Sequence, residues 1–342
     1  MNNRIYIYIK EYNTDLAKRQ PWYTIRKLKS DLEAINHEVE IITNLKDLPE
    51  SFDGHLIKTF SLKDLITRKP KNLKLTYLVT FPIYGFNKFF KMGFKILRSN
   101  WRDLKRILLM SLIPSYVLKR VLNKADNVLT ISDRSYNYLC SLGISSKKYY
   151  PFIFGNWGGV EVNNKTSKTI TLGYFGPPYS TRCFDKVVDF FEWISHNGYK
   201  FEKKIITRIE KKNLLKKEGN YRSKFENANI KVVSGFLSRE RLTAELLEID
   251  VFILPFEIVM SELPIVVLES LELNRKVIST PDSGVSNLVT NNKNMFILDE
   301  FSQKNYNSII EFINKPEVQD FSEVRNKIIQ NNKKTLKSIW QR

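Results

Sequence analysis

The sequence predicts an α/β protein built from two doubly wound domains, each a parallel sheet covered by helices. Short apolar runs alternate with amphipathic segments of helical period along both halves of the chain, which is the pattern of strand–helix–strand units. The length of 342 residues suits two domains of ordinary size. A polar stretch rich in Gly, Asn, Thr and Ser at residues 155–168 marks the expected boundary between them.

The first half opens with a strand expected at residues 5–9. An amphipathic helix is expected at 22–35, because its apolar residues recur at helical spacing: Ile25, Leu28, Leu32 and Ile35. Further strands are expected at 39–42, 75–79 and 127–131.

The second half repeats the alternation. Strands are expected at residues 169–175, 231–236, 251–256 and 276–280, and helices at 184–195, 237–247 and 265–274. A helix N-terminus beside parallel strands is a ready site for phosphate, because its free N–H groups and its dipole favour an anion. Glu262 and Glu269 stand on either side of the start of one such helix, where carboxylates can accept hydrogen bonds from sugar hydroxyls.

Composition excludes several classes of protein. No apolar run of about 18 residues exists, and the N-terminus lacks a signal peptide's apolar region. Two cysteines, Cys140 and Cys183, indicate a reducing compartment and no cysteine-based metal site. The three histidines show no metal-ligand spacing, and no D-x-D motif is present. A dinucleotide-binding dehydrogenase is disfavoured, since no G-x-G-x-x-G follows the first strand.

Two blocks together resemble the nucleotide-binding half of GT-B glycosyltransferases, in particular the retaining family 4 (glycosyl transferases group 1). The first is residues 169–185. The second matches at Ser261, Glu262, Pro264, Leu268, Glu269, Val277, Ile278 and Gly284. The resemblance implies two Rossmann-like domains facing a central cleft. An acceptor-binding domain is expected at 1–160, with a last helix within 320–342 packed back on it, and a nucleotide-sugar-binding domain at 165–318.

The resemblance also implies a donor site. Catalytic roles fall on Glu262, beside the donor sugar, and on Arg182, beside the diphosphate. Glu269 is the expected ribose ligand, and the backbone near residues 235–237 is expected to face the nucleobase. The implied donor-binding residues are Gly176, Arg182, Gly235, Phe236, Leu237, Ser261, Leu263, Pro264, Ile265 and Glu269.

The chain departs from the family pattern at three places. Six residues separate the two glutamates, one fewer than usual, and Pro177 stands where many members carry a second Arg. Residues 80–82 stand where many members place a His. Read without the resemblance, the second block is an ordinary strand–turn–helix with surface glutamates, and Arg182 is a surface residue at a helix start.

Residues 84–108 carry a basic stripe and an apolar stripe that both fit one helix. We expect this helix to lie on an anionic membrane surface, with rings in the headgroup boundary and cations against lipid phosphates. The alternative is a core-facing helix with a solvated basic face. The expected membrane contacts are Lys88, Phe90, Lys91, Phe94, Lys95, Arg98, Trp101 and Arg102.

The resemblance therefore implies a metal-independent, retaining hexosyltransferase without cofactors, which moves a sugar from a nucleotide sugar to a membrane-associated, lipid-linked glycan. It is expected on the cytoplasmic face of the membrane, in cell-envelope polysaccharide biosynthesis. Two alternatives stay open. A non-catalytic GT-B-like partner would explain the missing His. A basic nucleic-acid-binding protein would explain the net charge of +19, although no recognised module appears and no specific nucleic acid is expected.

Overall fold

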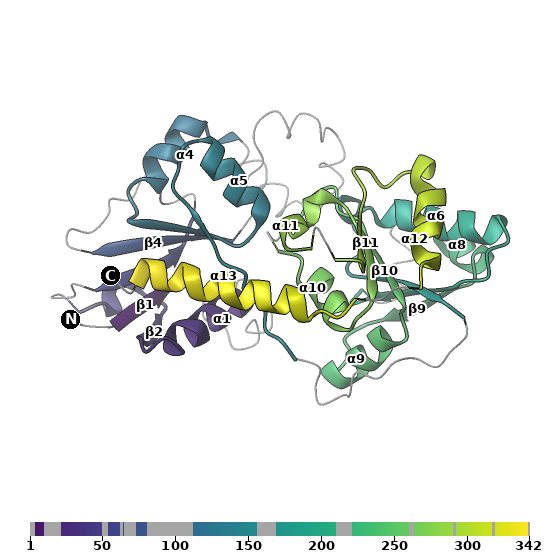
Figure 1. Ribbon diagram of the computed structural model, residues 1–342, viewed down its shortest axis with the longest axis horizontal. Helices are drawn as coiled ribbons and strands as arrows, with labels where there is room; N and C mark the ends of the chain where they lie inside the picture. Colours follow the sequence, from purple (N-terminus) through teal and green to yellow (C-terminus); the bar gives the residue numbers. More distant parts are fainter. Residues whose placement is uncertain are drawn as a thin grey trace. The chain divides into compact units, whose positions relative to one another are not determined.

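The computed structural model describes residues 4–9, 22–49, 54–61, 64, 73–80, 112–155, 169–209, 221–259, 263–289, 292–316 and 319–340. These residues fall into two compact units (Figure 1). The first contains residues 4–153, Leu263 and residues 325–340. The second contains residues 154–259 and 264–324.

The N-terminal unit is built on a parallel sheet in the order β2-β1-β3-β4-β5-β6. Its strands are β1 (Arg4–Tyr8), β2 (Glu38–Ile42), β3 (His55–Thr59), β4 (Lys74–Val79), β5 (Asn127–Thr130) and β6 (Lys147–Lys148). Its helices are α1 (Trp22–Glu33), α4 (Ser115–Leu122), α5 (Asp133–Ser141) and most of α13 (Ser322–Trp340). A short 3-10 turn, η2 (Leu45–Asp47), follows β2.

Alternate residues of these strands enter different layers of the core. Leu56 of β3 packs in a cluster with α4 and α5, through residues that include Leu118 and Leu139. Its neighbour His55 points to the other face, where its ring lies 6.2 Å from that of Trp340 on α13. This two-residue period places helices on both faces of the sheet, as the doubly wound prediction requires.

The C-terminal unit holds a second parallel sheet, in the order β12-β11-β10-β7-β8-β9. Its strands are β7 (Thr171–Phe175), β8 (Glu202–Thr207), β9 (Ile230–Ser234), β10 (Val251–Leu254), β11 (Lys276–Ser279) and β12 (Met295–Ile297). Its helices are α6 (Phe184–His196), α8 (Tyr221–Asn227), α9 (Arg239–Leu247), α10 (Ile265–Glu272), α11 (Ser286–Val289) and α12 (Tyr306–Asn314). The 3-10 turns are η5 (Ser180–Arg182), η6 (Pro281–Ser283) and η7 (Gln303–Asn305).

Strand β7 shows how this sheet is covered on both faces. Leu172 and Tyr174 join one core cluster with α6, α8 and α12, the helices that Figure 1 places on one side of the sheet. Gly173 between them points the other way, against Ile249. A Cβ at Gly173 would lie 2.3 Å from Ile249 Cδ1, so a larger residue here would force the buried Ile249 side chain to move.

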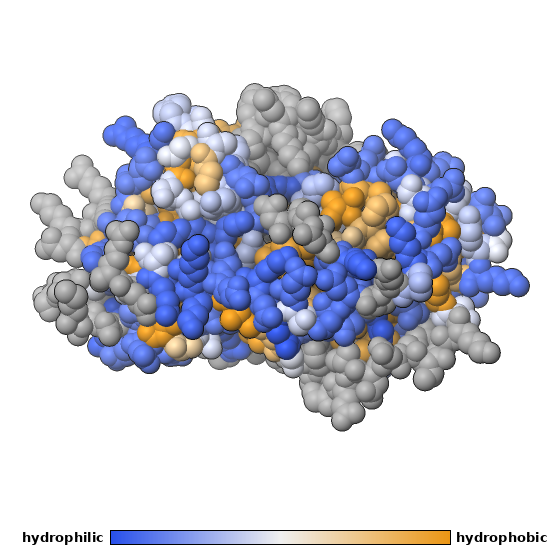
Figure 2. Space-filling view, viewed as in Figure 1, coloured by the Kyte–Doolittle hydropathy of each residue, from blue (hydrophilic) through white to orange (hydrophobic). Residues whose placement is uncertain are grey.

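Helix α13 has one buried stripe, and the rest of its surface is hydrophilic. Its buried residues recur every three or four positions: Val324, Ile328, Asn332, Thr335, Leu336, Ile339 and Trp340. The remaining positions are mostly polar, and the face of α13 visible in Figure 2 is hydrophilic. This is the amphipathic pattern of a helix packed on a core.

The predicted fold class is confirmed: two α/β units, each with a six-stranded parallel sheet. The expected elements of the second half lie within two residues of β7, α6, β9, α9, β10, α10 and β11. The double-striped segment at 84–108 lies outside the described residues. None of the helices in the described ranges is long and apolar enough to span a bilayer.

Candidate functional site

The candidate site is the carboxyl edge of the sheet in the C-terminal unit. Because all neighbouring strands run parallel, the loops that follow β7, β9, β10 and β11 leave the sheet at the same edge. Ligands of doubly wound proteins bind at this edge. Most of the predicted donor-binding residues stand in these loops.

The loop after β7 begins with a glycine that the geometry requires. Gly176 has φ +150°, and a Cβ there would lie 3.0 Å from Nη1 of Arg182. The hydroxyl of Tyr174 donates to the carbonyl of Pro177 at 2.6 Å, which fixes the start of the loop. Burial raises the pKa of Tyr174, although the positive charge of Arg182 opposes this. The phenol is therefore a stable donor at neutral pH.

Arg182 ends the turn η5 and contacts the loop that follows β10. Its guanidinium lies 5.5 Å from the centre of the Phe256 ring, which is cation–π geometry. The carbonyl of Thr181 accepts hydrogen bonds from the backbone N–H groups of Glu257 and Ile258, at 3.1 and 3.0 Å. These contacts tie the loop after β7 to the loop after β10.

A third loop joins the same assembly. The backbone N–H of Phe256 donates to Oγ1 of Thr280 at 2.9 Å, and this hydroxyl lies 2.5 Å from the carbonyl of Phe256. Thr280 directly follows β11. The loops after β7, β10 and β11 thus form one hydrogen-bonded support beneath Arg182.

The loop after β9 presents an aromatic side chain to solvent. Phe236 is 81% exposed. It follows Gly235, which has φ +99° and open space around an added Cβ. After Leu237, Ser238 caps α9, since its Oγ accepts from the backbone N–H of Arg241 at 3.2 Å. A large exposed ring of this kind has a face on which a planar group can stack.

Glu269 lies on α10 and is held by a partner from α9. Nη2 of Arg239 lies 3.0 Å from Oε1 of Glu269. The two side chains are 28% and 16% exposed, so water screens this pair only partly.

The start of α10 has no side-chain cap among the described residues. Pro264 occupies the cap position and has no side-chain acceptor, and the helix begins at Ile265. Free N–H groups in a first helical turn favour an anion. Leu263 is fully buried and belongs to the N-terminal unit.

Some predicted site residues fall outside the description. Ser261 and Glu262 lie outside the described residues, as do all eight expected membrane contacts. Their roles stay predictions. In the described ranges, no group of three or more His, Cys, Asp or Glu side chains is placed to hold a metal ion.

Sequence reasoning missed the residues that support the predicted ones. Phe256, Thr280 and Arg239 make the contacts that position Arg182 and Glu269. Phe256 and Thr280 carried a signal, because each is the last residue of an expected parallel strand, at the edge where ligands of such sheets bind. Arg239 carried a weaker one, as a cation in the first turn of a helix opposes its dipole.

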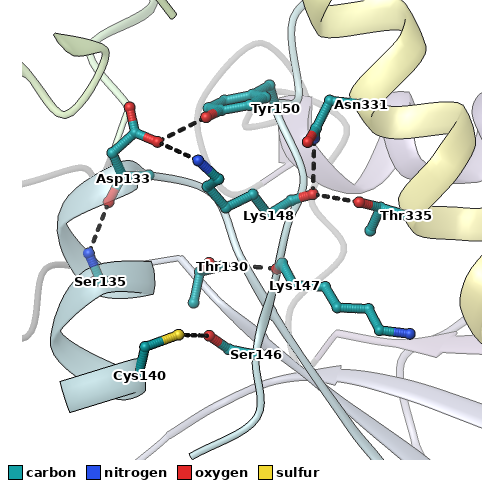
Figure 3. A network of polar contacts seen from close by, with 11 residues as sticks. Thr130, Asp133, Ser135, Cys140, Ser146, Lys147, Lys148, Tyr150, Asn331 and Thr335 are labelled. Atoms are coloured by element: carbon teal, nitrogen blue, oxygen red, sulfur yellow. Dashed lines mark hydrogen bonds and ion pairs between the residues drawn. The ribbon is translucent and has the colours of Figure 1, made fainter. Parts of the chain in front are cut away.

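The N-terminal unit has a buried polar network at the carboxyl end of β5 (Figure 3). Asp133 at the start of α5 accepts hydrogen bonds from Lys148 Nζ at 3.0 Å and from the Tyr150 hydroxyl at 2.8 Å. Asn331 and Thr335 of α13 both donate to the carbonyl of Lys148 at 2.9 Å. The network fastens α13 to β6, the strand at one edge of this sheet, and so has a structural role.

Comparison with known proteins gives the geometry a context. Residues 203–335 match the family described as Glycosyl transferases group 1. None of the curated protein sequences matches the chain. The solved structure of WaaG, a glycosyltransferase involved in lipopolysaccharide biosynthesis, is similar over 98% of each chain, with TM-score 0.58 and 10% identity.

Two further structures have the same architecture. Sucrose-phosphate synthase from Thermosynechococcus elongatus has TM-score 0.61 and 12% identity, over 98% of this chain and 94% of that one. The E. coli trehalose-6-phosphate structure bound with UDP-2-fluoro glucose has TM-score 0.57 and 11% identity, over 96% and 80%. The chain has the GT-B fold, and its residues 203–335 are similar to glycosyl transferases group 1.

This GT-B assignment confirms the predicted protein class, a glycosyltransferase of GT-B fold. At identities of 10–12%, the solved structures speak for the fold alone. Membership of family 4, retention of configuration and the identity of the acceptor stay predictions.

Proposed function

We propose that this GT-B protein transfers a sugar from a nucleotide sugar to a membrane-associated, lipid-linked glycan, with retention of configuration and without a metal. The observation that carries the proposal is the support of Arg182 by three loops at the carboxyl edge of the sheet. Such a fixed cation suits a leaving group that develops negative charge.

Arg182 is proposed to stabilise the departing diphosphate. Cleavage of a nucleotide sugar leaves negative charge on the diphosphate and positive charge on the sugar. A cation held by Phe256 and by the neighbouring backbone contacts needs little rearrangement during the reaction. Electrostatic preorganisation of this kind is the largest catalytic term in many enzymes. The start of α10, which has no side-chain cap, is proposed as a second anion-binding element.

The nucleoside is proposed to lie between the loop after β9 and the second turn of α10. There the exposed ring of Phe236 suits stacking on a base, and the carboxylate of Glu269 suits the ribose hydroxyls. The solved E. coli neighbour contains UDP-2-fluoro glucose, which supports a nucleotide sugar as the ligand class. Glu262 is proposed to contact the donor sugar.

The N-terminal unit is proposed to bind the acceptor, and residues 84–108 to dock it on the cytoplasmic leaflet. The basic and apolar stripes of this segment and the net charge of +19 support anionic lipid as the surface. WaaG, which shares the fold, takes part in lipopolysaccharide biosynthesis. That role supports a lipid-linked glycan as the acceptor class.

A thermal-shift screen tests the donor proposal. A ligand that binds only the folded state raises the melting temperature, by an amount set by its concentration relative to Kd. The panel comprises UDP-, GDP- and ADP-linked hexoses, each with EDTA present. A shift with at least one donor is expected. No shift with any of them, together with a shift on adding a nucleic acid duplex, would favour the nucleic-acid-binding alternative.

Turnover separates an enzyme from a scaffold. A non-catalytic GT-B-like partner would bind a nucleotide sugar and release no nucleoside diphosphate from it. The transferase proposed here releases the diphosphate when a suitable acceptor is present.

A further inference from the structure

Arg239 stands at a position that the stability of its own helix does not explain. It is the first residue of α9, where a cation opposes the helix dipole. Ser238 already caps this end, and Glu240 supplies the favourable first-turn charge. The contact with Glu269 gives this arginine a role that the capping of α9 does not.

The Arg239–Glu269 pair differs from the exposed ion pairs of the same unit. Arg222 and Glu226 on α8 pair with side chains 77% and 67% exposed, which is a setting of little energetic weight. Arg239 and Glu269 are 28% and 16% exposed. The two residues lie 30 positions apart in sequence, and their contact joins α9 to α10. A partly desolvated, charge-assisted hydrogen bond is stronger and more directional.

The geometry leaves one carboxylate oxygen for another task. Arg239 contacts Oε1 of Glu269, and within the described residues the Glu269 side chain makes no other hydrogen bond. A carboxylate has acceptor sites on both oxygens. The arginine thus fixes the side-chain orientation of Glu269 while Oε2 keeps its capacity to accept.

We propose that Arg239 is a positioning residue that orients Glu269 toward the ribose hydroxyls and thereby sets the preference for ribonucleotide over deoxyribonucleotide donors. This inference rests on the proposed donor site. A simple cross-link between α9 and α10 would support stability and would leave ribose selectivity untouched. Selectivity therefore separates a positioning role from a structural one.

Isothermal titration with UDP, GDP and ADP identifies the diphosphate that the wild type binds most tightly. The affinities for its 2′-deoxy and 3′-deoxy forms are then measured and compared with the affinity for the parent diphosphate. A lost hydrogen bond to a charged group weakens binding about tenfold to a hundredfold. The wild type should show such a preference for at least one hydroxyl. Arg239→Gln should reduce the preference to within about threefold. Arg239→Lys should fall between, because a lysine donates from one point and lacks the guanidinium fork.

Arg241→Gln is the matched control, since it removes the same charge from an exposed site on the same helix. It should keep the wild-type preference. If either folded Arg239 variant prefers the ribonucleotide as strongly as the wild type does, the inference is overturned. Binding of the diphosphate by these variants would still support the proposed function. Failure of the wild type to bind any of the three diphosphates overturns both.

Discussion

The guanidinium of Arg182 rests on the ring of Phe256, at 5.5 Å from its centre. The cation that ends the loop after β7 is thereby carried by the loop after β10. The carbonyl of Thr181 accepts two backbone hydrogen bonds from that same loop. Arg182 is thus positioned by the meeting of two parallel strands at one edge, a relationship that only the folded sheet creates.

Replacing Arg182 by Ala should lower kcat/KM for sugar transfer by about 100-fold or more, which is the effect of removing one preorganised group from a developing charge. The melting temperature should change little, because the loop keeps its backbone hydrogen bonds. Steady-state kinetics on the donor found by the thermal-shift screen provides the measurement. Arg222→Ala, a charge loss at an exposed site, is the control. Near-normal turnover of Arg182→Ala would remove this residue from the site.

Phe236→Ala should weaken binding of the nucleoside diphosphate by about 1–3 kcal/mol, the scale of one base stacked on an aromatic ring. The side chain is 81% exposed, so its removal should leave the free energy of unfolding nearly unchanged. Phe236→Trp should retain most of the affinity. Titration calorimetry gives the answer, and equal affinity of Phe236→Ala and the wild type would place the base elsewhere.

Asn332→Ala should destabilise the N-terminal unit by about 2–4 kcal/mol, because two backbone groups would each lose a buried partner. The Asn332 side chain accepts from the N–H of Tyr150 at 2.9 Å and donates to its carbonyl at 2.8 Å. Urea unfolding followed by tryptophan fluorescence measures the loss. Asn326→Ala, at an exposed position of α13, should show less than a quarter of the effect. Equal effects of the two substitutions would refute this account of how α13 is fastened.

Liposome flotation should show the protein bound to anionic vesicles and absent from zwitterionic ones. Each Lys or Arg near an anionic surface contributes about 1 kcal/mol, and added salt screens this attraction. Lys91→Glu with Lys95→Glu should reduce the bound fraction. Lys333→Glu with Lys334→Glu makes the same charge change on the exposed face of α13 and serves as the control. If the wild type does not bind anionic vesicles at low salt, the basic stripe of residues 84–108 is only a solvated face and the membrane proposal is wrong.

Much of the fold was predictable because local patterns and tertiary packing agree. Helix α6 begins at Phe184 as expected, since the loop from Gly176 to Arg182 supplies a clear break between two apolar segments. Strand β8 was missed because its sequence, EKKIIT, has lysines at positions that become buried. The buried ammonium of Lys204 pairs with the carboxylates of Glu245 and Glu248, and a local sequence pattern does not reveal that pairing.

The residues of the candidate site also fall into those that the sequence predicts and those that it does not. Glu269 and Arg182 stand out in sequence because residue types recur at fixed distances from strands and turns. Arg239 lies 30 positions before Glu269, and Phe256 lies 74 positions after Arg182. Their contacts come from crossovers between parallel strands. No local spacing indicates which side chains such crossovers bring together.

The most direct test of the central claim is the release of nucleoside diphosphate from UDP-, GDP- and ADP-linked hexoses, measured with EDTA present and with membrane lipid extract as the acceptor. Steady release from at least one donor is expected for the wild type. Glu269→Ala should weaken binding of that donor by about 1–3 kcal/mol, the scale of hydrogen bonds to a charged group. Absence of release from every donor, in protein that nevertheless binds nucleotide sugars, would contradict the account and leave a GT-B scaffold without catalysis.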